Sequence, residues 1–124
     1  MNRQLSEYLD LLFASASSPH ANAAWRPAAD VYRCEHGWLL KFDLAGVRPE
    51  DIEIHVQGRT IVVAGTRRDS RVYQRQQAHR MEISYSRFER SVELPEEIAE
   101  AEVRTEYRDG MLLVHVLARG EADS

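Results

Sequence analysis

The amino-acid sequence predicts an all-β protein, an antiparallel sandwich of short strands, and three observations support this prediction. Several short runs of residues alternate between apolar and polar side chains with a period of two, most clearly residues 38–44 and 52–57. Turn-forming pairs separate the runs, and Asp109-Gly110 is the strongest of these pairs. Between residues 25 and 119 no helical pattern of useful length interrupts the series, which favours a sandwich over a mixed fold.

The first half of the predicted sandwich contains four strands. They are expected, in order, at residues 31–34, 38–44, 52–57 and 60–64. His36-Gly37 is expected to turn the first strand into the second. Gly58-Arg59 is expected to join the third and fourth strands as a hairpin.

The second half contains three more predicted strands. Tyr85, Phe88 and Val92 are expected on the first of them, which ends at Leu94-Pro95. Residues 103–107 and 111–116 flank the Asp109-Gly110 turn and are expected to form the last hairpin.

A long polar segment at residues 65–82 fits neither a strand nor a helix. It is rich in arginine and glutamine, and Val72-Tyr73 is its only apolar pair. Loops of this length are uncommon in compact domains and are usually functional or disordered. Because one chain offers the segment little to bury, we expect a second subunit to complete it.

The first 24 residues are expected to form an arm separate from the sandwich. Its apolar side chains follow the spacing of one helical face and are Leu5, Tyr8, Leu9, Leu12 and Phe13. Residues 14–24 have the composition of a flexible linker. A helix this short is marginal alone in water, so it needs its own domain, a partner chain or another protein to pack against. At the other end, residues 120–124 are expected to be a short disordered tail.

Composition favours a globular protein of the cytoplasm. Apolar residues make up 44% and charged residues 29% of the 124 residues. The net charge of −4 gives no overall attraction to nucleic acid or to an anionic membrane, and no apolar stretch is long enough to span one. The N-terminus lacks the features of a signal peptide. The single cysteine, Cys34, suits a reducing compartment and is expected to be a small packing residue on its strand.

No motif for catalysis, nucleotide binding or metal binding is apparent, so we expect no enzyme and no cofactor. The five histidines are widely spaced and are expected as solvated side chains, although strands could bring His55 and His115 together. The glutamates of residues 96–102 are expected to lie in a solvated acidic loop. The arginines of residues 67–80 lack the interleaved aromatic side chains of a single-strand binder.

Several segments together resemble the α-crystallin domain of bacterial small heat-shock proteins. They are Trp25-x-Pro27 with residues 30–32, residues 43–52, residues 63–67, residues 82–90 with Leu94-Pro95, and residues 107–112 with 116–119. The resemblance covers about 95 of the 124 residues in the family's order, which is more specific than any single motif. It implies an immunoglobulin-like sandwich over residues 25–119.

The resemblance also implies a homodimer formed by strand exchange. In bacterial and plant members the long loop, here residues 67–80, carries a strand that pairs with an early strand of the partner. Tyr73 would lie on the exchanged strand, and Val31 and Tyr32 on the strand that receives it. Arg90 falls at the family's arginine near the dimer contact.

A further implication of the resemblance is a groove between the family's strands 4 and 8. We place this groove at Ile52, Ile54, Val103 and Thr105. Family members generally carry an I-x-I/V motif in their C-terminal tail, which docks into the groove of a neighbouring dimer. Residues 120–124 contain no such motif. We therefore expect a groove open to a client or to another small heat-shock protein, and a dimer or small assembly.

The function implied by the resemblance is that of an ATP-independent holdase chaperone of the stress response. The expected client contacts are the sheet edges and the apolar face of the arm, Leu5, Leu9, Leu12 and Phe13. An alternative is a dedicated co-chaperone or assembly adaptor that binds one specific partner through the same sandwich.

Overall fold

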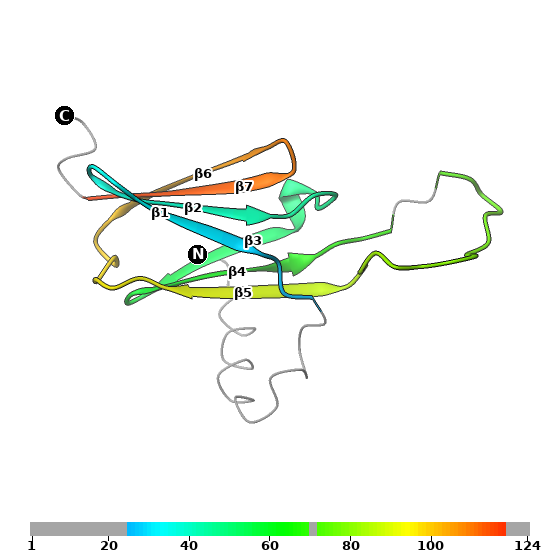
Figure 1. Cartoon of the computed structure of the whole chain (residues 1–124), viewed down its shortest axis with the longest axis horizontal. Coiled ribbons are helices and arrows are strands. Elements are labelled where there is room, and N and C mark those ends of the chain that lie inside the picture. Colours follow the sequence, from blue (N-terminus) through cyan, green and yellow to red (C-terminus); the bar gives the residue numbers. More distant parts are fainter. Residues whose placement is uncertain (1–24, 70–71, 119–124) are drawn as a thin grey trace, which may run out of the picture.

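Two antiparallel sheets pack face to face in the computed structural model of the chain (Figure 1). The structure describes residues 25–69 and 72–118, so the predicted arm at residues 1–24 and tail at residues 120–124 lie outside the described residues. One sheet has the strand order β1-β2-β7-β6 and the other has the order β3-β4-β5. The predicted all-β sandwich with an immunoglobulin-like arrangement is confirmed.

The strands follow the predicted order along the chain. They are β1 (Ala29–Cys34), β2 (Gly37–Asp43), β3 (Ile52–Gln57), β4 (Thr60–Thr66), β5 (Arg87–Glu93), β6 (Glu102–Arg108) and β7 (Met111–Leu117), and a 3-10 turn, η1 (Pro49–Asp51), precedes β3. The hairpin predicted at Asp109-Gly110 joins β6 to β7. Asp109 has a φ of 55° and Gly110 a φ of 79°, as a type I′ hairpin turn requires.

The first turn lies one residue earlier than predicted. Glu35 and His36 form it, and Gly37 is already the first residue of β2. Gly37 pairs with Leu117 of β7, and a Cβ at position 37 would lie 1.9 Å from the carbonyl oxygen of Val116. Glycine is therefore required at position 37 because the backbones of β2 and β7 approach closely there, and not because of the turn.

The strand predicted from Tyr85, Phe88 and Val92 begins later than expected. β5 starts at Arg87, and Tyr85 is an exposed residue of the preceding loop. Phe88 and Val92 are separated by an even number of positions and share the inner face of the strand, whereas Tyr85 is three positions from Phe88. A period of two cannot place all three side chains on one face.

The core lies between the inner faces of the two sheets. Phe42 of β2 and Phe88 of β5 are its largest fully buried side chains. The remaining buried members of the core are Leu40, Leu44, Val47, Ile61, Val63, Val92, Leu94, Ile98, Leu112, Val114 and Val116. Trp25 closes one end, because its ring packs edge-to-face on Phe88 with 5.4 Å between the ring centroids.

Two side-chain predictions were wrong. His55 is buried rather than solvated, and it lies in the sheet opposite that of His115, which instead pairs with Glu106. Cys34 is exposed rather than packed, because it is the last residue of an edge strand. The glutamates of the acidic loop are exposed as predicted, and Glu96 also accepts a hydrogen bond of 2.9 Å from the indole of Trp38.

Candidate functional site

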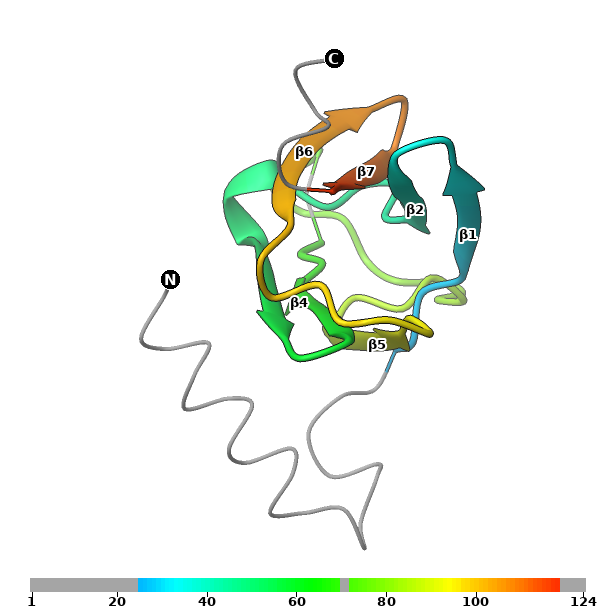
Figure 2. The same ribbon diagram turned by 90° about the vertical axis from the view of Figure 1, so that its left-hand side faces the viewer.

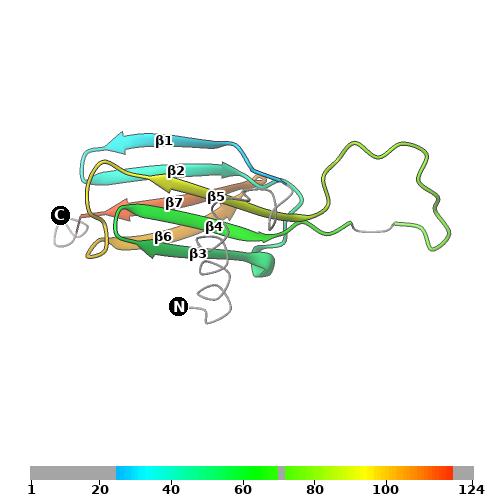
Figure 3. The same ribbon diagram turned by 90° about the horizontal axis from the view of Figure 1, so that it is seen from below.

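The sandwich has two open sides, each bordered by the edge strands of both sheets. Figures 2 and 3 show β3 and β6 together on one side and β1 and β5 on the other. In the described residues each of these four strands pairs with only one neighbouring strand. An edge strand presents backbone N–H and C=O groups that can pair with an added extended segment.

The side bordered by β3 and β6 carries the residues predicted for the groove. Ile52 and Ile54 of β3 and Val103 of β6 are half-buried and pack against the core from the edges. Thr105 follows Val103 on the same face of β6 and is exposed. Two edge strands from different sheets thus place apolar side chains along one seam, which we call the β3/β6 seam.

Two residues of this seam were missed by the sequence-based prediction. Val56 of β3 and Tyr107 of β6 are also half-buried and pack against the core. The hydroxyl of Tyr107 donates a 2.7 Å hydrogen bond to the carbonyl oxygen of Leu44, which fixes its ring at the end of the seam. The signal was present, because Val103, Thr105 and Tyr107 alternate with charged residues.

The opposite side carries the residues predicted to receive the exchanged strand. Val31 and Tyr32 of β1 are exposed, and the ring of Tyr32 lies 5.0 Å from the ammonium group of Lys41. Valine and tyrosine are favoured in strands with a covered face. Their exposure on an edge strand leaves apolar area available for a further strand.

The loop between β4 and β5 extends well beyond the sandwich (Figures 1 and 3). Tyr73 is 73% exposed, and no strand is present in the described part of the loop. Of the eight large apolar side chains that are exposed in the described residues, all but Met111 belong to this loop or to β1: Val31, Tyr32, Val72, Tyr73, Met81, Ile83 and Tyr85. Apolar exposure is thus concentrated on two features of the molecule.

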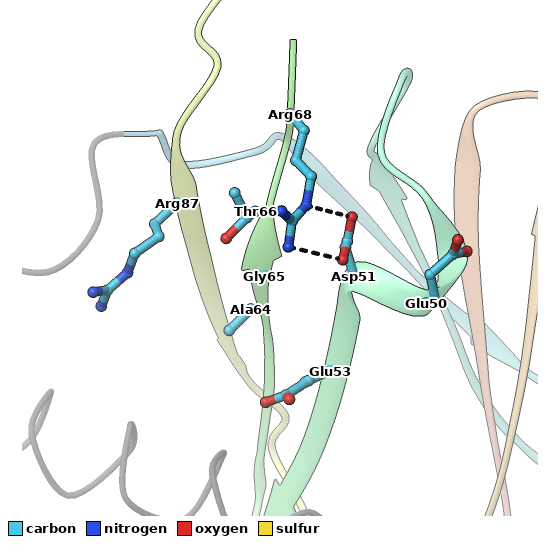
Figure 4. A pocket seen from close by; sticks show the side chains of 8 residues that line it. All are labelled: Glu50, Asp51, Glu53, Ala64, Gly65, Thr66, Arg68 and Arg87. Atoms are coloured by element: carbon cyan, nitrogen blue, oxygen red, sulfur yellow. Dashed lines mark hydrogen bonds and ion pairs between the residues drawn. The ribbon is translucent and has the colours of Figure 1, made fainter. Parts of the chain in front are cut away.

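Two arginines hold the base of this loop against the sandwich. Arg67 donates from Nε to the carbonyl oxygen of Ser84, at 2.8 Å, and from Nη1 to that of Ala45, at 3.2 Å. Arg68 donates two hydrogen bonds, of 3.1 and 3.4 Å, to the carboxylate of Asp51 (Figure 4). The loop is therefore anchored at its base.

Arg90 lies at the edge of β5 that faces the β1 side. Its Nη1 donates a 3.1 Å hydrogen bond to the carbonyl oxygen of Pro27, just before β1. Its Nε is buried and has no hydrogen-bond partner in the described residues. Arg90 thus connects the two edges of this side within one chain and retains an unused donor.

A shallow cavity of about 370 Å³ lies beside the base of the loop (Figure 4). It is lined by Glu50, Asp51, Glu53, Ala64, Gly65, Thr66, Arg68 and Arg87. Asp51 is already paired with Arg68. In the described parts of the chain no group of three or more His, Cys, Asp or Glu side chains could hold a metal ion, and no helix there is long and apolar enough to cross a membrane.

Comparison with known proteins agrees with this geometry. The chain is 29% identical over 109 residues to spore protein SP21 of Stigmatella aurantiaca, covering 88% of this chain and 63% of that protein. It is 24% identical to small heat shock protein C2 of Rickettsia felis, covering 84% of this chain and 66% of that protein. The chain therefore spans just under two thirds of the length of these relatives.

Solved structures show the same fold. The structure of HspA from Xanthomonas axonopodis superposes with a TM-score of 0.64 at 25% identity, covering 78% of this chain and 97% of that one. A small heat-shock protein from Xylella fastidiosa gives a TM-score of 0.64 at 26% identity, covering 79% and 90%. The sequence model of the Hsp20/alpha crystallin family matches residues 30–123. This chain is a member of the Hsp20/alpha crystallin family.

Proposed function

We propose that the protein is an ATP-independent holdase chaperone that binds partly unfolded proteins and prevents their aggregation. The observation that supports this most directly is the β3/β6 seam, where half-buried apolar side chains lie beside unpaired strand edges. A partly unfolded protein exposes both apolar side chains and unpaired backbone groups. A surface that offers both can hold many different clients without a fixed geometry.

The proposed client contacts are the seam residues Ile52, Ile54, Val103 and Thr105 together with the apolar face of the arm. That face, Leu5, Leu9, Leu12 and Phe13, lies outside the described residues and enters the proposal through its sequence pattern alone. The seam also suits an extended segment with two isoleucines spaced by one residue, because alternate side chains of a strand point to the same side. Other small heat-shock proteins that carry such a motif are therefore proposed partners.

The proposed working unit is a homodimer formed by strand exchange. The exposed apolar side chains of the loop, Tyr73 above all, would pair with the partner's β1 at Val31 and Tyr32. Such an exchange would cover the two features on which apolar exposure is concentrated. The unused Nε of Arg90, on the same side of the sandwich, would gain a partner there. We also propose that the protein is located in the cytoplasm. The free, exposed thiol of Cys34 is compatible with that reducing compartment.

The test is aggregation of several unrelated proteins on heating, followed by light scattering without ATP. We expect the protein to suppress scattering of all of them. Val103→Asp, which places a charge in the seam, should weaken suppression, whereas Arg104→Asp, which places the same charge on the outer side of β6, should not. Capture of one native protein with no suppression of any heated client would instead identify a dedicated adaptor.

A further inference from the structure

The edge strand β6 carries charges of alternating sign on its outer face. They are Glu102, Arg104, Glu106 and Arg108, and all four residues are exposed. Within the chain, Arg104 contacts Glu102, and Nε of Arg108 lies 3.9 Å from Oε2 of Glu106. Glu106 also lies 3.1 Å from the imidazole of His115 on β7. Ion pairs that are this exposed contribute little to stability, so their members can change partners at small cost.

The open edge of β6 lacks most of the features that prevent a further strand from pairing. Edge strands are commonly protected by a proline, a bulge, an inward-pointing charge, or outer charges that an added strand does not match. β6 contains no proline, and its pairing with β7 is continuous. Its inward-facing residues, Val103, Thr105 and Tyr107, are uncharged. The strand that can pair with β6 is therefore one that matches its outer charges.

The backbone groups at this open edge belong to the uncharged residues. Arg108 and Met111 flank the two-residue turn, and residues in that position direct their backbone N–H and C=O groups toward each other. The direction of these groups alternates along a strand. Val103, Thr105 and Tyr107 therefore direct theirs toward the open edge, where the part of the chain that the structure describes places no strand.

We propose that the open edge of β6 pairs antiparallel with the same edge of a second copy of this chain, in a register centred on Thr105. Two-fold symmetry then places each residue opposite the residue at the same distance on the other side of Thr105. The opposed pairs are Glu102 with Arg108, Val103 with Tyr107, Arg104 with Glu106, and Thr105 with Thr105. Opposite charges, an aromatic ring beside a β-branched side chain, and paired threonines are each favourable across strands.

The backbone and the charges both select this register. The pairs formed by Val103, Thr105 and Tyr107 are the hydrogen-bonded ones and would give about six backbone hydrogen bonds. The charged pairs fall between them, where side chains from two strands come closest. Moving one strand by one full side-chain repeat would place Arg104 opposite Arg104, or Glu106 opposite Glu106. Like charges therefore disfavour the neighbouring registers.

Pairing through β6 would also close the β3/β6 seam. The two-fold axis of an antiparallel pair is perpendicular to the sheet, so the three-stranded sheets of both copies would lie on the same side. Because β3 and β6 border the same side of the sandwich, Ile52 and Ile54 would then face the second copy (Figures 2 and 3). Self-pairing and client binding would exclude each other, a consequence that rests on the proposed function, whereas the pairing itself does not.

The first experiment is cross-linking between copies of the full chain through one engineered cysteine, with Cys34→Ser. Two copies of Thr105→Cys would place their cysteines directly opposite, at a Cα separation of about 5.5 Å that suits a disulfide. In the control Val103→Cys, the two cysteines would be about 13 Å apart along the strands, which is too far. Mild oxidation should link Thr105→Cys and leave Val103→Cys largely unlinked. Equal yields, or the reverse order, would overturn the register.

The second experiment reverses the charges, with Thr105→Cys retained as the reporter. Arg104→Glu places like charges opposite each other twice, and so does Glu106→Arg. Each change alone should raise the chain concentration needed for half-maximal cross-linking about tenfold. In a mixture of the two variants opposite charges face each other again, so cross-linking between them should return to the level of the parent chain. A mixture that does not recover would overturn recognition by charge.

The pairing and the proposed function fail separately. If heated clients aggregate beside the native chain while Thr105→Cys cross-links as expected, the pairing stands and the holdase function is wrong. If the native chain protects clients while cross-linking does not follow the expected pattern, the holdase function stands and the pairing is wrong. Where both hold, reducing the linked Thr105→Cys dimer should increase its suppression of aggregation. Equal suppression before and after reduction would overturn the competition between pairing and client binding.

Discussion

The guanidinium of Arg67 stacks on the ring of Trp25, with 3.7 Å between Cζ and the ring centroid. The same guanidinium donates to the carbonyl oxygens of Ser84 and Ala45. One side chain therefore connects the first described residue, both ends of the long loop and the segment after β2. A planar guanidinium can stack and donate at once, which an ammonium group cannot do.

Replacing Arg67 should weaken the base of the loop more than replacing its neighbour. Arg67→Ala removes the stacking and both hydrogen bonds, and we expect it to lower the free energy of unfolding by about 1–2 kcal/mol. Arg68→Ala removes only the pair with Asp51, in which the guanidinium is exposed and the carboxylate is largely buried, and should cost about 1 kcal/mol. Urea unfolding of the two variants measures the difference. Equal losses would contradict the larger role of Arg67.

Tyr73 should govern self-association. Removing a large aromatic side chain from the centre of an interface commonly costs more than 1 kcal/mol, so Tyr73→Ala should raise the dissociation constant of the dimer about tenfold or more. Gln77→Ala changes an exposed polar residue of the same loop and should have little effect. Sedimentation equilibrium at several concentrations measures both. A dissociation constant unaltered by Tyr73→Ala would exclude the loop from the dimer contact.

The β3/β6 seam should bind a short peptide that contains two isoleucines separated by one residue. We expect Val103→Asp to weaken this binding about tenfold, or about 1.4 kcal/mol, because it buries a charge against the peptide. Arg104→Asp is the matched control on the outer side of the same strand. Calorimetry with the peptide and with a double-alanine version of it measures the effect. Equal affinity for the two peptides would contradict recognition by the seam.

Most of the fold could be predicted from the sequence because local signals agreed with one another. The alternation in residues 38–44 and the Asp109-Gly110 pair are determined within a few residues, and both appear in the structure as expected. Ile52, Ile54 and Val103 lie on neighbouring edges of the two sheets. That juxtaposition followed from the resemblance to a known family and not from the pattern itself.

The wrong predictions concern burial that depends on distant parts of the chain. An alternating strand pattern marks one face as solvated, and His55 lies on that face of β3. His55 is nevertheless buried, which the alternation of β3 does not indicate. Cys34 failed for the opposite reason, because every residue of β1 after Ala29 is exposed, so a small apolar side chain there has nothing to pack against.

His55 should make folding stability depend on pH. Burial lowers the pKa of His55 in the folded chain below its unfolded value of about 6.5. Above that value the imidazole is neutral in both states and stability is unaffected. As the pH falls through 6.5, the unfolded chain binds a proton that the folded chain does not, so stability decreases until the lowered folded pKa is passed.

His55→Gln should remove this part of the pH dependence. The carboxylates on the same face, Glu53 of β3 with Glu89 and Glu93 of β5, remain in both proteins and cancel in the comparison. We expect the native chain to lose more stability than His55→Gln between pH 7.5 and pH 5.5 in urea unfolding. His79→Gln, in the exposed loop, should behave like the native chain. Parallel curves for the native chain and His55→Gln would contradict the prediction.

Gly65, in the penultimate position of β4, should tolerate no side chain. A Cβ there would lie 2.0 Å from the carbonyl oxygen of Asp51 and 2.8 Å from the ring of Phe88. Neither can move away easily, because Asp51 ends η1 and Phe88 is fully buried. We therefore expect Gly65→Ala to lower the free energy of unfolding by about 3 kcal/mol, at the upper end of the cost of overpacking.

A glycine with a different role provides the control. Gly58 lies in the turn between β3 and β4 and has a φ of 62°. A Cβ added there would lie 3.7 Å from its nearest neighbour, the carboxylate oxygen Oε1 of Glu97. Asparagine tolerates this left-handed conformation, so Gly58→Asn should cost less than about 1 kcal/mol. Because β4 is the central strand of its sheet, Gly65→Ala should also shift the Phe88 ring signals in NMR spectra while Gly58→Asn leaves them in place. If the urea midpoint of Gly65→Ala equals that of the native chain, η1 and β3 must be free to move away from β4, and the prediction is wrong.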